Sequence, residues 1–567
     1  MKKLLKIALA AFLACVCALS LIACNASDEV TGGGDNANGG YEDDNNDNTG
    51  DPSGGNTGDP SGGNTGDNTG GNTGGNTGDN TGGNTGGNTG DPSGGEETLG
   101  IDKNLTFPVV SVNFTDGAPT KKDDGYMPCA VSTDGDDSAE LISNAEAKIK
   151  IRGNSTAEGE KKPYRIKFTS KQPMLGLNGG NKFKSWVLLA DCFDYSMSRN
   201  YFILQASKIF TNVYSSDCRY VNLYFDGKYK GVYLLAEQTQ VNKNRVNVDE
   251  KSVETSADTG YLLEADTRAL TECVLFDKTG AAKSYYELNG TGDVSVKTIE
   301  QMATANDYIA GKDYCFDVTY NYSTSKGSVT AHQLFAVKND LSSDKQIAFL
   351  QLEKIQAYMQ NCYNVIFGSV TQSEFEKYID IKSAADMFII NNLASLRGGK
   401  RSDFYSVDFT KDNPKLNFGP PWDYDLDCAN YNLKSAAGGG NNENFFGDNP
   451  NAFSASYNPS YVLGALYKKD FIVSAAKTRW KETRAYEHLK ALIDSLDPEN
   501  TYSVPNEHEY DFNKNYTLYK FFGKKTYPYQ SDAVLSFTSH KDAVAYFVSW
   551  MNLHLTFANN FYNAERF

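Results

Sequence analysis

The chain has 567 residues, a formal net charge of −17 and an aromatic content of 12%. This length is sufficient for one large domain or two closely associated ones. Lys and Arg form no dense stripe interleaved with aromatic residues, so we expect no nucleic-acid partner. The five histidines have no metal-binding spacing, and GxSxG, HExxH and P-loop motifs are absent. The sequence therefore excludes the common zinc peptidases, serine hydrolases and P-loop proteins.

The N-terminus has the order of residues that is typical of an export signal. Three lysines within the first six residues precede an apolar run at residues 7–23. Leu-Ile-Ala then leads directly to Cys24, the arrangement at which bacterial lipoproteins are acylated and cleaved. We expect residues 1–24 to be a lipoprotein signal peptide and Cys24 to be the lipidation site, which would hold the protein at the cell surface or in the periplasm. An uncleaved membrane anchor and lipidation at Cys15 are the alternatives.

Residues 25–98 have the composition of a disordered spacer. They consist largely of Gly, Asn, Thr, Asp, Ser and Pro in units such as GGNTGDNTGGNTG, with fourteen acidic residues and no Lys or Arg. Such a segment has too little apolar surface to form a core. Its repeat is also too short to be a solenoid module. We expect a flexible Gly-rich linker before a mildly acidic globular domain at residues 99–567.

The domain is expected to begin with strands and to continue mainly with helices. Alternating or apolar runs predict strands at 147–152, 164–168, 186–190, 220–225, 231–236 and 260–264, mostly in an antiparallel sheet. A helix at 197–210, capped by Ser196 or Ser198, interrupts them. Later helices are expected at 345–362, 373–380, 383–396, 470–495 and 533–562, with hairpin strands at 403–409 and 415–419. Residues 99–144 are expected to be a small accessory strand segment. This order indicates an α+β fold, with a sheet-rich lobe followed by a helical lobe.

The cysteines of the domain favour neither a zinc site nor a dense disulfide framework, because they are widely spaced and odd in number. They are Cys129, Cys192, Cys218, Cys273, Cys315, Cys362 and Cys428. One or two bridges could still form after export.

Five sequence blocks carry a family resemblance. In chain order they are residues 149–155 (IKIRGNS), 161–168 (KKPYRIKF), 184–190 (KSWVLLA), 231–238 (GVYLLAEQ) and 419–426 (GPPWDYDL). In their order and spacing over residues 145–430, they resemble the CotH family of spore-coat proteins. The resemblance implies an atypical, bilobed protein-kinase fold with a sheet-rich N-lobe and a helical C-lobe, the helical C-terminal part being residues 431–567. It also implies phosphorylation of surface or spore-coat proteins with ATP and a divalent metal.

Phosphoryl transfer needs cations at the nucleotide phosphates. Lys162 and Lys167 flank a strand at the chain position where a kinase places its phosphate-binding lysine, although either could be an ordinary surface lysine. Arg152, in an Arg-Gly-Asn-Ser turn, could bind a phosphate or brace the loop. Glu237 is a candidate ion-pair partner for a lysine, because the expected helix at 197–210 contains no glutamate.

Phosphoryl transfer also needs carboxylates that hold a metal ion. Asp423, Asp425 and Asp427 follow a Pro-Pro turn, and hard oxygen ligands this close in sequence suit Mg²⁺ or Mn²⁺ better than zinc. We expect Asp423 to be the first metal ligand and Asp425 the second, both with catalytic roles. Calcium binding and helix capping are the alternatives.

One loop departs from the family pattern. Residues 395–402 read SLRGGKRS and contain no carboxylate, so Leu396 and Gly398 stand where family members place an Asn-x-Asp that resembles a catalytic base. Asp403 is near, but at the start of a strand. Two functions therefore remain. One is an ATP- and Mg²⁺- or Mn²⁺-dependent phosphotransferase acting on extracytoplasmic or surface proteins. The other is a catalytically inactive relative that binds a surface ligand through exposed aromatic residues.

Overall fold

The computed structural model describes residues 101–564, apart from 136–138, 266–274, 277–281, 284–314, 325–326, 396–402, 433–448 and 454–460. The expected signal peptide, Cys24, the whole of the expected linker and the loop at 396–402 lie outside the described residues. No helix in the described part combines the length and apolar character that are needed to cross a membrane.

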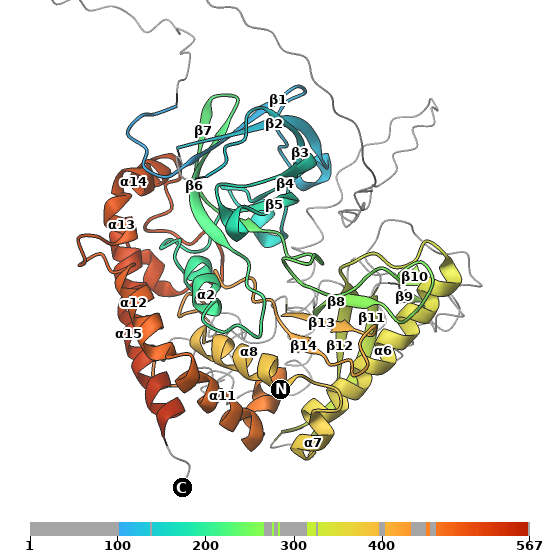
Figure 1. Cartoon of the computed structure of the whole chain (residues 1–567). Coiled ribbons are helices and arrows are strands. Elements are labelled where there is room, and N and C mark those ends of the chain that lie inside the picture. The colour runs from blue at the N-terminus through green and yellow to red at the C-terminus, as the bar shows by residue number, and fades with distance from the viewer. Residues whose placement is uncertain are drawn as a thin grey trace, which may run out of the picture. The chain divides into compact units, whose positions relative to one another are not determined.

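Seven strands close into a barrel, in the order β1-β2-β3-β4-β5-β7-β6 (Figure 1). They are β1 (Val109–Phe114), β2 (Met127–Asp134), β3 (Ala145–Ile151), β4 (Tyr164–Gln172), β5 (Phe183–Leu189), β6 (Cys218–Phe225) and β7 (Lys228–Glu237). All neighbours are antiparallel except β1 and β6, which are parallel. In β4, Tyr164, Ile166 and Phe168 are buried, whereas Arg165 and Lys167 are half-buried. The period of two in the sequence thus places alternate side chains inside the barrel.

The expected strands of the first half are all present; five of them belong to the closed barrel, and the one at 260–264 is β8 of a second sheet. Residues 99–144, expected to be an accessory segment, supply β1 and β2, which complete the barrel. Closure depends on β1 pairing with β6, where Val109 lies opposite Asn222. That contact joins residues more than one hundred positions apart, so local alternation does not reveal it.

A second sheet of five antiparallel strands has the order β11-β12-β8-β13-β14. Its strands are β8 (Gly260–Ala265), β11 (Cys315–Thr324), β12 (Gly327–Val337), β13 (Asp403–Asp408) and β14 (Asn417–Phe418), and a separate hairpin is formed by β9 (Leu275–Phe276) and β10 (Ala282–Lys283). Helix α6 (Lys345–Phe367) packs along β11 (Figure 1). The expectation of a mainly helical second half missed β11 and β12, although β11 alternates apolar and polar residues, with Phe316 and Val318 buried.

The remaining helices pack mainly on one another. They are α2 (Arg199–Ser207), α7 (Gln372–Phe375), α8 (Ile381–Leu393), α10 (Val462–Tyr467), α11 (Asp470–Glu482), α12 (Ala485–Asp494), α13 (Val504–Glu507), α14 (Glu509–Leu518) and α15 (His540–Asn563). Short 3₁₀ turns are η1 (Lys122–Asp124), η2 (Ser155–Glu158), η3 (Leu177–Gly180) and η5 (Asp532–Leu535). Helix α8 contacts α11 and α2, and α14 contacts barrel strand β7.

Several of the expected helices are divided or shorter than predicted. The expected helix at 470–495 is divided into α11 and α12, because Arg484 has a φ of +49° and cannot continue a right-handed helix. The expected helix at 373–380 is limited to α7. The expected helix at 533–562 becomes η5 followed by α15, which begins where Ser539 and Asp542 form a capping box.

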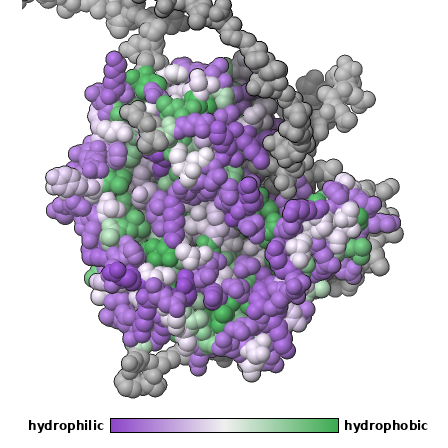
Figure 2. Space-filling view, viewed as in Figure 1, coloured by the Kyte–Doolittle hydropathy of each residue, from purple (hydrophilic) through white to green (hydrophobic). Residues whose placement is uncertain are grey.

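The buried apolar side chains form two clusters. One fills the barrel, and the other lies between the second sheet and the helices. Tyr201, Val504 and Tyr546 pack against both clusters, so the two cores are continuous. The described cysteine side chains are buried free thiols, at Cys129, Cys192, Cys218, Cys362 and Cys428. The face in Figure 2 is mainly hydrophilic, with apolar residues in small separate areas.

Candidate active site

Residues 419–430, here called the Asp loop, follow β14 and carry the three predicted aspartates. Asp423 is half-buried, whereas Asp425 and Asp427 are 6% and 1% exposed. The segment is too short to bury itself, so other elements must hold it. Two separate parts of the chain do so: helix α2 with its preceding loop, which gives two supports, and the end of helix α8, which gives a third.

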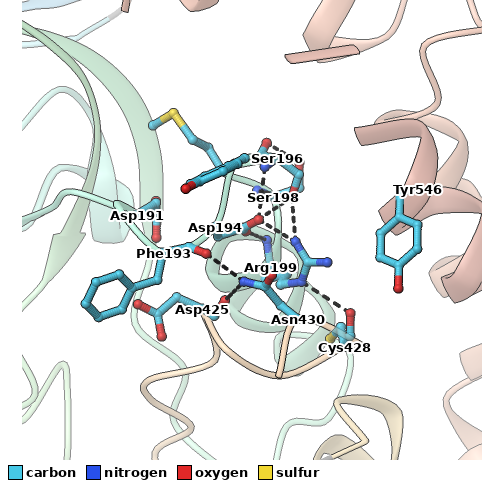
Figure 3. Close-up of polar contacts among 12 residues, drawn as sticks. Asp191, Phe193, Asp194, Ser196, Ser198, Arg199, Asp425, Cys428, Asn430 and Tyr546 are labelled. Atoms are coloured by element: carbon cyan, nitrogen blue, oxygen red, sulfur yellow. Dashed lines mark hydrogen bonds and ion pairs between the residues drawn. The ribbon is translucent and has the colours of Figure 1, made fainter. Parts of the chain in front are cut away.

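The first support is an ion pair at the start of α2. Asp194 pairs with Arg199, and both side chains are at most 2% exposed. The second carboxylate oxygen of Asp194 accepts from the backbone N–H of Arg199 at 2.8 Å. The guanidinium Nε of Arg199 donates to the carbonyl oxygens of Asp427 and Cys428, at 3.1 and 3.2 Å (Figure 3). Arg199 therefore fixes the backbone of the Asp loop from beneath.

The second support comes from Asn200, the next residue of α2. Its Oδ1 accepts from the backbone N–H of Tyr424, between the two predicted metal ligands, at 2.8 Å. Its Nδ2 donates to Asp191 at 2.8 Å. The other carboxylate oxygen of Asp191 is buried and has no hydrogen-bond partner in the described part of the chain. Burial, and then the nearby Asp194, raise the pKa of Asp191. A buried carboxyl with a raised pKa therefore lies directly behind the Asp loop.

A buried lysine adds to this electrostatic arrangement. Lys161 is 1% exposed, donates to the carbonyl of Val232, and lies 4.7 Å from the ring centre of Tyr233. Burial lowers the pKa of Lys161, and the charge of Asp191 partly opposes that effect. Lys161 and Asp191 thus compensate each other inside the protein.

The third support is the C-terminal end of α8. The hydroxyl of Tyr424 donates to Asn391 Oδ1 at 2.9 Å, and the backbone N–H of Cys428 donates to the carbonyl of Ala394 at 2.7 Å. Asn391 lies on α8, and α8 leads into the loop at 396–402. The structure therefore brings the Asp loop to the helix after which the family places its catalytic base.

Strained backbone conformations gather in these segments. Eleven non-glycine residues in the described part have positive φ values, and six of them belong to the Asp loop, the loop before α2 or the end of α8. These six are Asp191, Met197, Ser395, Asp423, Cys428 and Ala429. Such conformations are costly and persist where the surroundings enforce them, which is common at functional sites. Their concentration here supports the interpretation of the Asp loop as a functional element.

Two of the predicted phosphate-binding residues lie in defined surroundings. The guanidinium of Arg152 lies 5.7 Å from the ring centre of Trp422, the residue before Asp423, so Arg152 reaches the Asp loop from the barrel. Lys162 Nζ donates to the carbonyl of Ala157 at 2.8 Å and to that of Gly159 at 3.4 Å. Lys162 therefore closes the C-terminal end of the turn η2.

The other two predicted residues are on the barrel. Lys167 is half-buried on β4, opposite Lys148 of β3 and Ser185 of β5. Glu237 is 1% exposed and pairs with Arg245 at 3.0 Å, rather than with a lysine. It also accepts from Asn178 at 2.6 Å.

The sequence interpretation missed the residues that hold the Asp loop, namely Asp191, Asp194, Arg199 and Asn200. It named Ser196 or Ser198 as the cap of this helix. Ser198 occupies the capping position but makes no capping hydrogen bond, and Asp194 accepts from the first N–H of the helix instead. The signal in the sequence was a run of small polar and acidic residues just before Arg199, at the start of an apolar helix. A buried arginine requires an acidic partner.

The donor set of the Asp loop fits one kind of metal ion. No group of three or more His, Cys, Asp or Glu side chains in the described residues could hold a metal ion by itself. Mg²⁺ is commonly held by one or two carboxylates together with waters and substrate phosphates. The carboxylates of Asp423 and Asp425, the predicted ligands, are of the chemical type that such an ion takes, whereas the oxygen-only donor set does not suit a closed structural zinc site.

Comparison with protein families gives a match over most of the domain. A family model described as CotH kinase protein matches residues 149–551, a range that includes the end of β3, the barrel strands from β4 to β7, the Asp loop and the first half of α15. No curated protein matches the chain.

Proposed function

Because the chain belongs to the CotH kinase protein family, we propose that it is an ATP- and metal-dependent phosphotransferase acting on extracytoplasmic or surface proteins. The observation that carries this proposal is the junction of the Asp loop with the end of α8 through Tyr424 and Asn391. Kinase-type phosphoryl transfer requires its metal-binding aspartate and the loop that orients the acceptor to lie side by side. In this proposal the barrel is the N-lobe of a bilobed kinase-like fold, and the second sheet with its helices is the C-lobe.

The proposal assigns roles to residues of this chain. Asp423 and Asp425 would hold Mg²⁺ or Mn²⁺, which supplies positive charge at the phosphates of ATP. Arg152, beside Trp422, would bind a phosphate, and Lys167 or Lys162 would add a second cation. Arg199 and Asn200 keep the backbone of the Asp loop in one conformation, so that little reorganisation is needed when the nucleotide binds. The lipid on Cys24 and the linker would keep the domain near the membrane and its substrates.

An inactive, ligand-binding relative is the second candidate. Its support is the sequence of residues 395–402, which has no carboxylate to act as a base. However, the expected exposed aromatic residues are scarce in the described part, where Tyr502 and Tyr510 are the aromatic members of the large exposed apolar side chains. Phosphoryl transfer depends more on positioning and charge than on a strong base. The phosphotransferase is therefore the better supported candidate.

Nucleotide binding tests the proposal most directly. We expect ATP with Mg²⁺ or Mn²⁺ to raise the melting temperature of the wild-type protein, and Asp423→Ala to remove that increase. Asp412→Ala is the matched control, because Asp412 is an exposed aspartate in the loop between β13 and β14. No increase in the wild type at millimolar ATP would reject the kinase function, and an increase that Asp423→Ala leaves unchanged would reject the assigned metal site. Phosphate transfer to a general acceptor protein would then separate an active enzyme from an inactive nucleotide-binding relative.

A further inference from the structure

The loop before α2 carries two buried aspartates that contact successive residues of the helix (Figure 3). Asp194 pairs with Arg199, and Asp191 accepts a hydrogen bond from Nδ2 of Asn200 at 2.8 Å. Arg199 then donates to carbonyl oxygens of the Asp loop, whereas Asn200 accepts from the backbone N–H of Tyr424. The charge of Arg199 explains the presence of Asp194. Asp191 faces a neutral amide, so its role needs a separate explanation.

The hydrogen bonds from Tyr424 to Asn200 and from Asn200 to Asp191, here called the Asn200 relay, require one orientation of the asparagine amide. A backbone N–H can only donate, so the atom 2.8 Å from the N–H of Tyr424 is Oδ1. The other end of the amide is then Nδ2, a donor that needs an acceptor, and Asp191 supplies it. Rotating the amide by half a turn would turn an NH₂ group toward the N–H of Tyr424. An acceptor at position 191 therefore selects the orientation in which Asn200 can hold the Asp loop.

Asp191 is itself held in place. It is 5% exposed, and its φ of +47° is unusual for a residue other than glycine. Its carbonyl oxygen accepts from the backbone N–H of Asp194 at 3.1 Å, which closes the turn between the two aspartates. Burial raises the pKa of Asp191 and lowers that of Lys161, and the opposite charge of each partner acts against the effect of burial. Because Lys161 also donates to Val232 of β7, it connects the carboxyl with the barrel.

A similar arrangement lies in the second sheet. Oδ1 of Asn339 accepts from the backbone N–H of Leu262 at 2.7 Å, and Nδ2 donates to Glu250 at 2.7 Å. Here too a carboxyl faces the amide of an asparagine that holds backbone, but the backbone belongs to strand β8. Asn339 therefore offers a matched comparison for Asn200.

We propose that Asp191 is a positioning residue for the metal site: through Asn200 it fixes the backbone between Asp423 and Asp425. The identity of the metal ligands in this inference rests on the proposed function. The Asn200 relay depends only on the fold, so the relay and the metal site can be tested separately.

Exchanging the side chains at positions 191 and 200 tests the relay in the full-length protein. Asn200→Asp places two carboxyl groups face to face, so we expect amide exchange in the Asp loop to become about tenfold faster, the equivalent of one lost hydrogen bond. Asp191→Asn/Asn200→Asp again places a donor opposite an acceptor and keeps the net charge. Its exchange should therefore return to within about threefold of the wild-type rate. Hydrogen–deuterium exchange with mass spectrometry measures these rates, and residues that merely fill space would show no such rescue.

Affinity for Mn²⁺ with ATP, measured by titration calorimetry, tests the link from the relay to the metal site. We expect Asn200→Asp to weaken this affinity about tenfold and the double variant to recover it. Asn339→Asp is the matched control, because it places a carboxyl opposite Glu250 in the second sheet. It should destabilise the protein but leave both the exchange of the Asp loop and the affinity unchanged.

The relay is overturned if the double variant exchanges as fast as Asn200→Asp, or if Asn339→Asp accelerates exchange in the Asp loop equally. If Asn200→Asp does not fold, a folded double variant is itself the rescue, and failure of both to fold overturns the relay. Rescued exchange without recovered affinity would overturn the positioning role alone. Rescued exchange in a protein whose wild type does not bind Mn²⁺ with ATP would reject the proposed function together with the positioning role, and would leave the relay as a support of the fold.

Discussion

Two arginine–carboxylate pairs in the described part of the chain are equally withdrawn from water but join different elements. Arg199 and Asp194 lie at the start of α2, and Arg199 extends to the backbone of the Asp loop. Arg245 and Glu237 lie beside the barrel, where Arg245 also donates to the carbonyl of Ser185. Through Arg199, the first pair reaches residues more than two hundred positions away in the sequence. The second pair connects segments that are neighbours in the barrel.

This difference predicts which of the two buried pairs affects the candidate metal site. The guanidinium of Arg245 is also stacked 3.7 Å from the ring centre of Phe183, so all its contacts stabilise the barrel. Arg199 instead holds a loop with strained backbone at Asp423 and Cys428, a conformation that would relax without support. We therefore expect loss of either arginine to destabilise the protein, and only loss of Arg199 to disturb the candidate metal site.

The largest effect is expected for Arg199→Leu. Removing one partner leaves Asp194 buried without its cation, which costs about 3–5 kcal/mol of unfolding free energy, and the hydrogen bonds to Asp427 and Cys428 are lost as well. Urea denaturation measures the stability. In a thermal-shift scan that starts where the variant is folded, ATP and metal should not raise its melting temperature. If ATP and metal raise the melting temperature of Arg199→Leu as much as that of the wild type, the Asp loop does not depend on Arg199.

Arg245→Leu provides the matched comparison. Its loss leaves Glu237 buried, so we expect a decrease in unfolding free energy of about 3–4 kcal/mol, partly offset by apolar contact of the new side chain with Phe183. The ATP-dependent increase in melting temperature should be retained in this variant. Loss of that increase would mean that the barrel pair also positions the site, and the contrast between the two pairs would fail.

Lowering the pH should reduce the free energy of unfolding through His540, which contacts the loop before α2. His540 is buried, its Nε2 lies 2.9 Å from the carbonyl of Ser196, and burial lowers its pKa to about 4. The unfolded chain binds a proton near pH 6.5, so between pH 6.5 and 4 it holds more protons at this site than the folded chain does. Stability from this group is therefore complete above pH 6.5 and falls, by on the order of 3 kcal/mol, as the pH decreases to 4.

Urea denaturation between pH 7 and 4.5 checks this expectation, with His540→Gln as the comparison. The variant should lose less stability on acidification than the wild type does. The raised pKa of Asp191 acts in the opposite direction over part of this range, because its protonation favours the folded state. The difference between wild type and variant isolates the histidine, and parallel pH profiles would contradict its role.

The sequence predicted local structure better than it predicted contacts. The alternation of Tyr164, Ile166 and Phe168 was sufficient to place β4, and a short motif was sufficient to locate Asp423 and Asp425. Barrel closure and the support of the Asp loop were not predictable, because they depend on partners distant in the sequence. A buried arginine such as Arg199 indicates that an acid is near, but its contacts with Asp427 and Cys428 follow only from the fold. The roles of Asp423 and Asp425 as metal ligands remain predictions.

The smallest expected effect distinguishes two roles of Lys162. Its Nζ donates to the carbonyls of Ala157 and Gly159, so Lys162→Met should cost about 1 kcal/mol of unfolding free energy, the typical value of a lost hydrogen bond. Since these contacts already occupy the ammonium, we expect the affinity for ATP to change less than twofold. Lys167→Met is the comparison for ATP affinity, because Lys167 is the alternative phosphate-binding lysine. A tenfold loss of ATP affinity in Lys162→Met alone would mean that Lys162 leaves η2 to bind a phosphate. Such a loss in Lys167→Met alone would assign that role to β4.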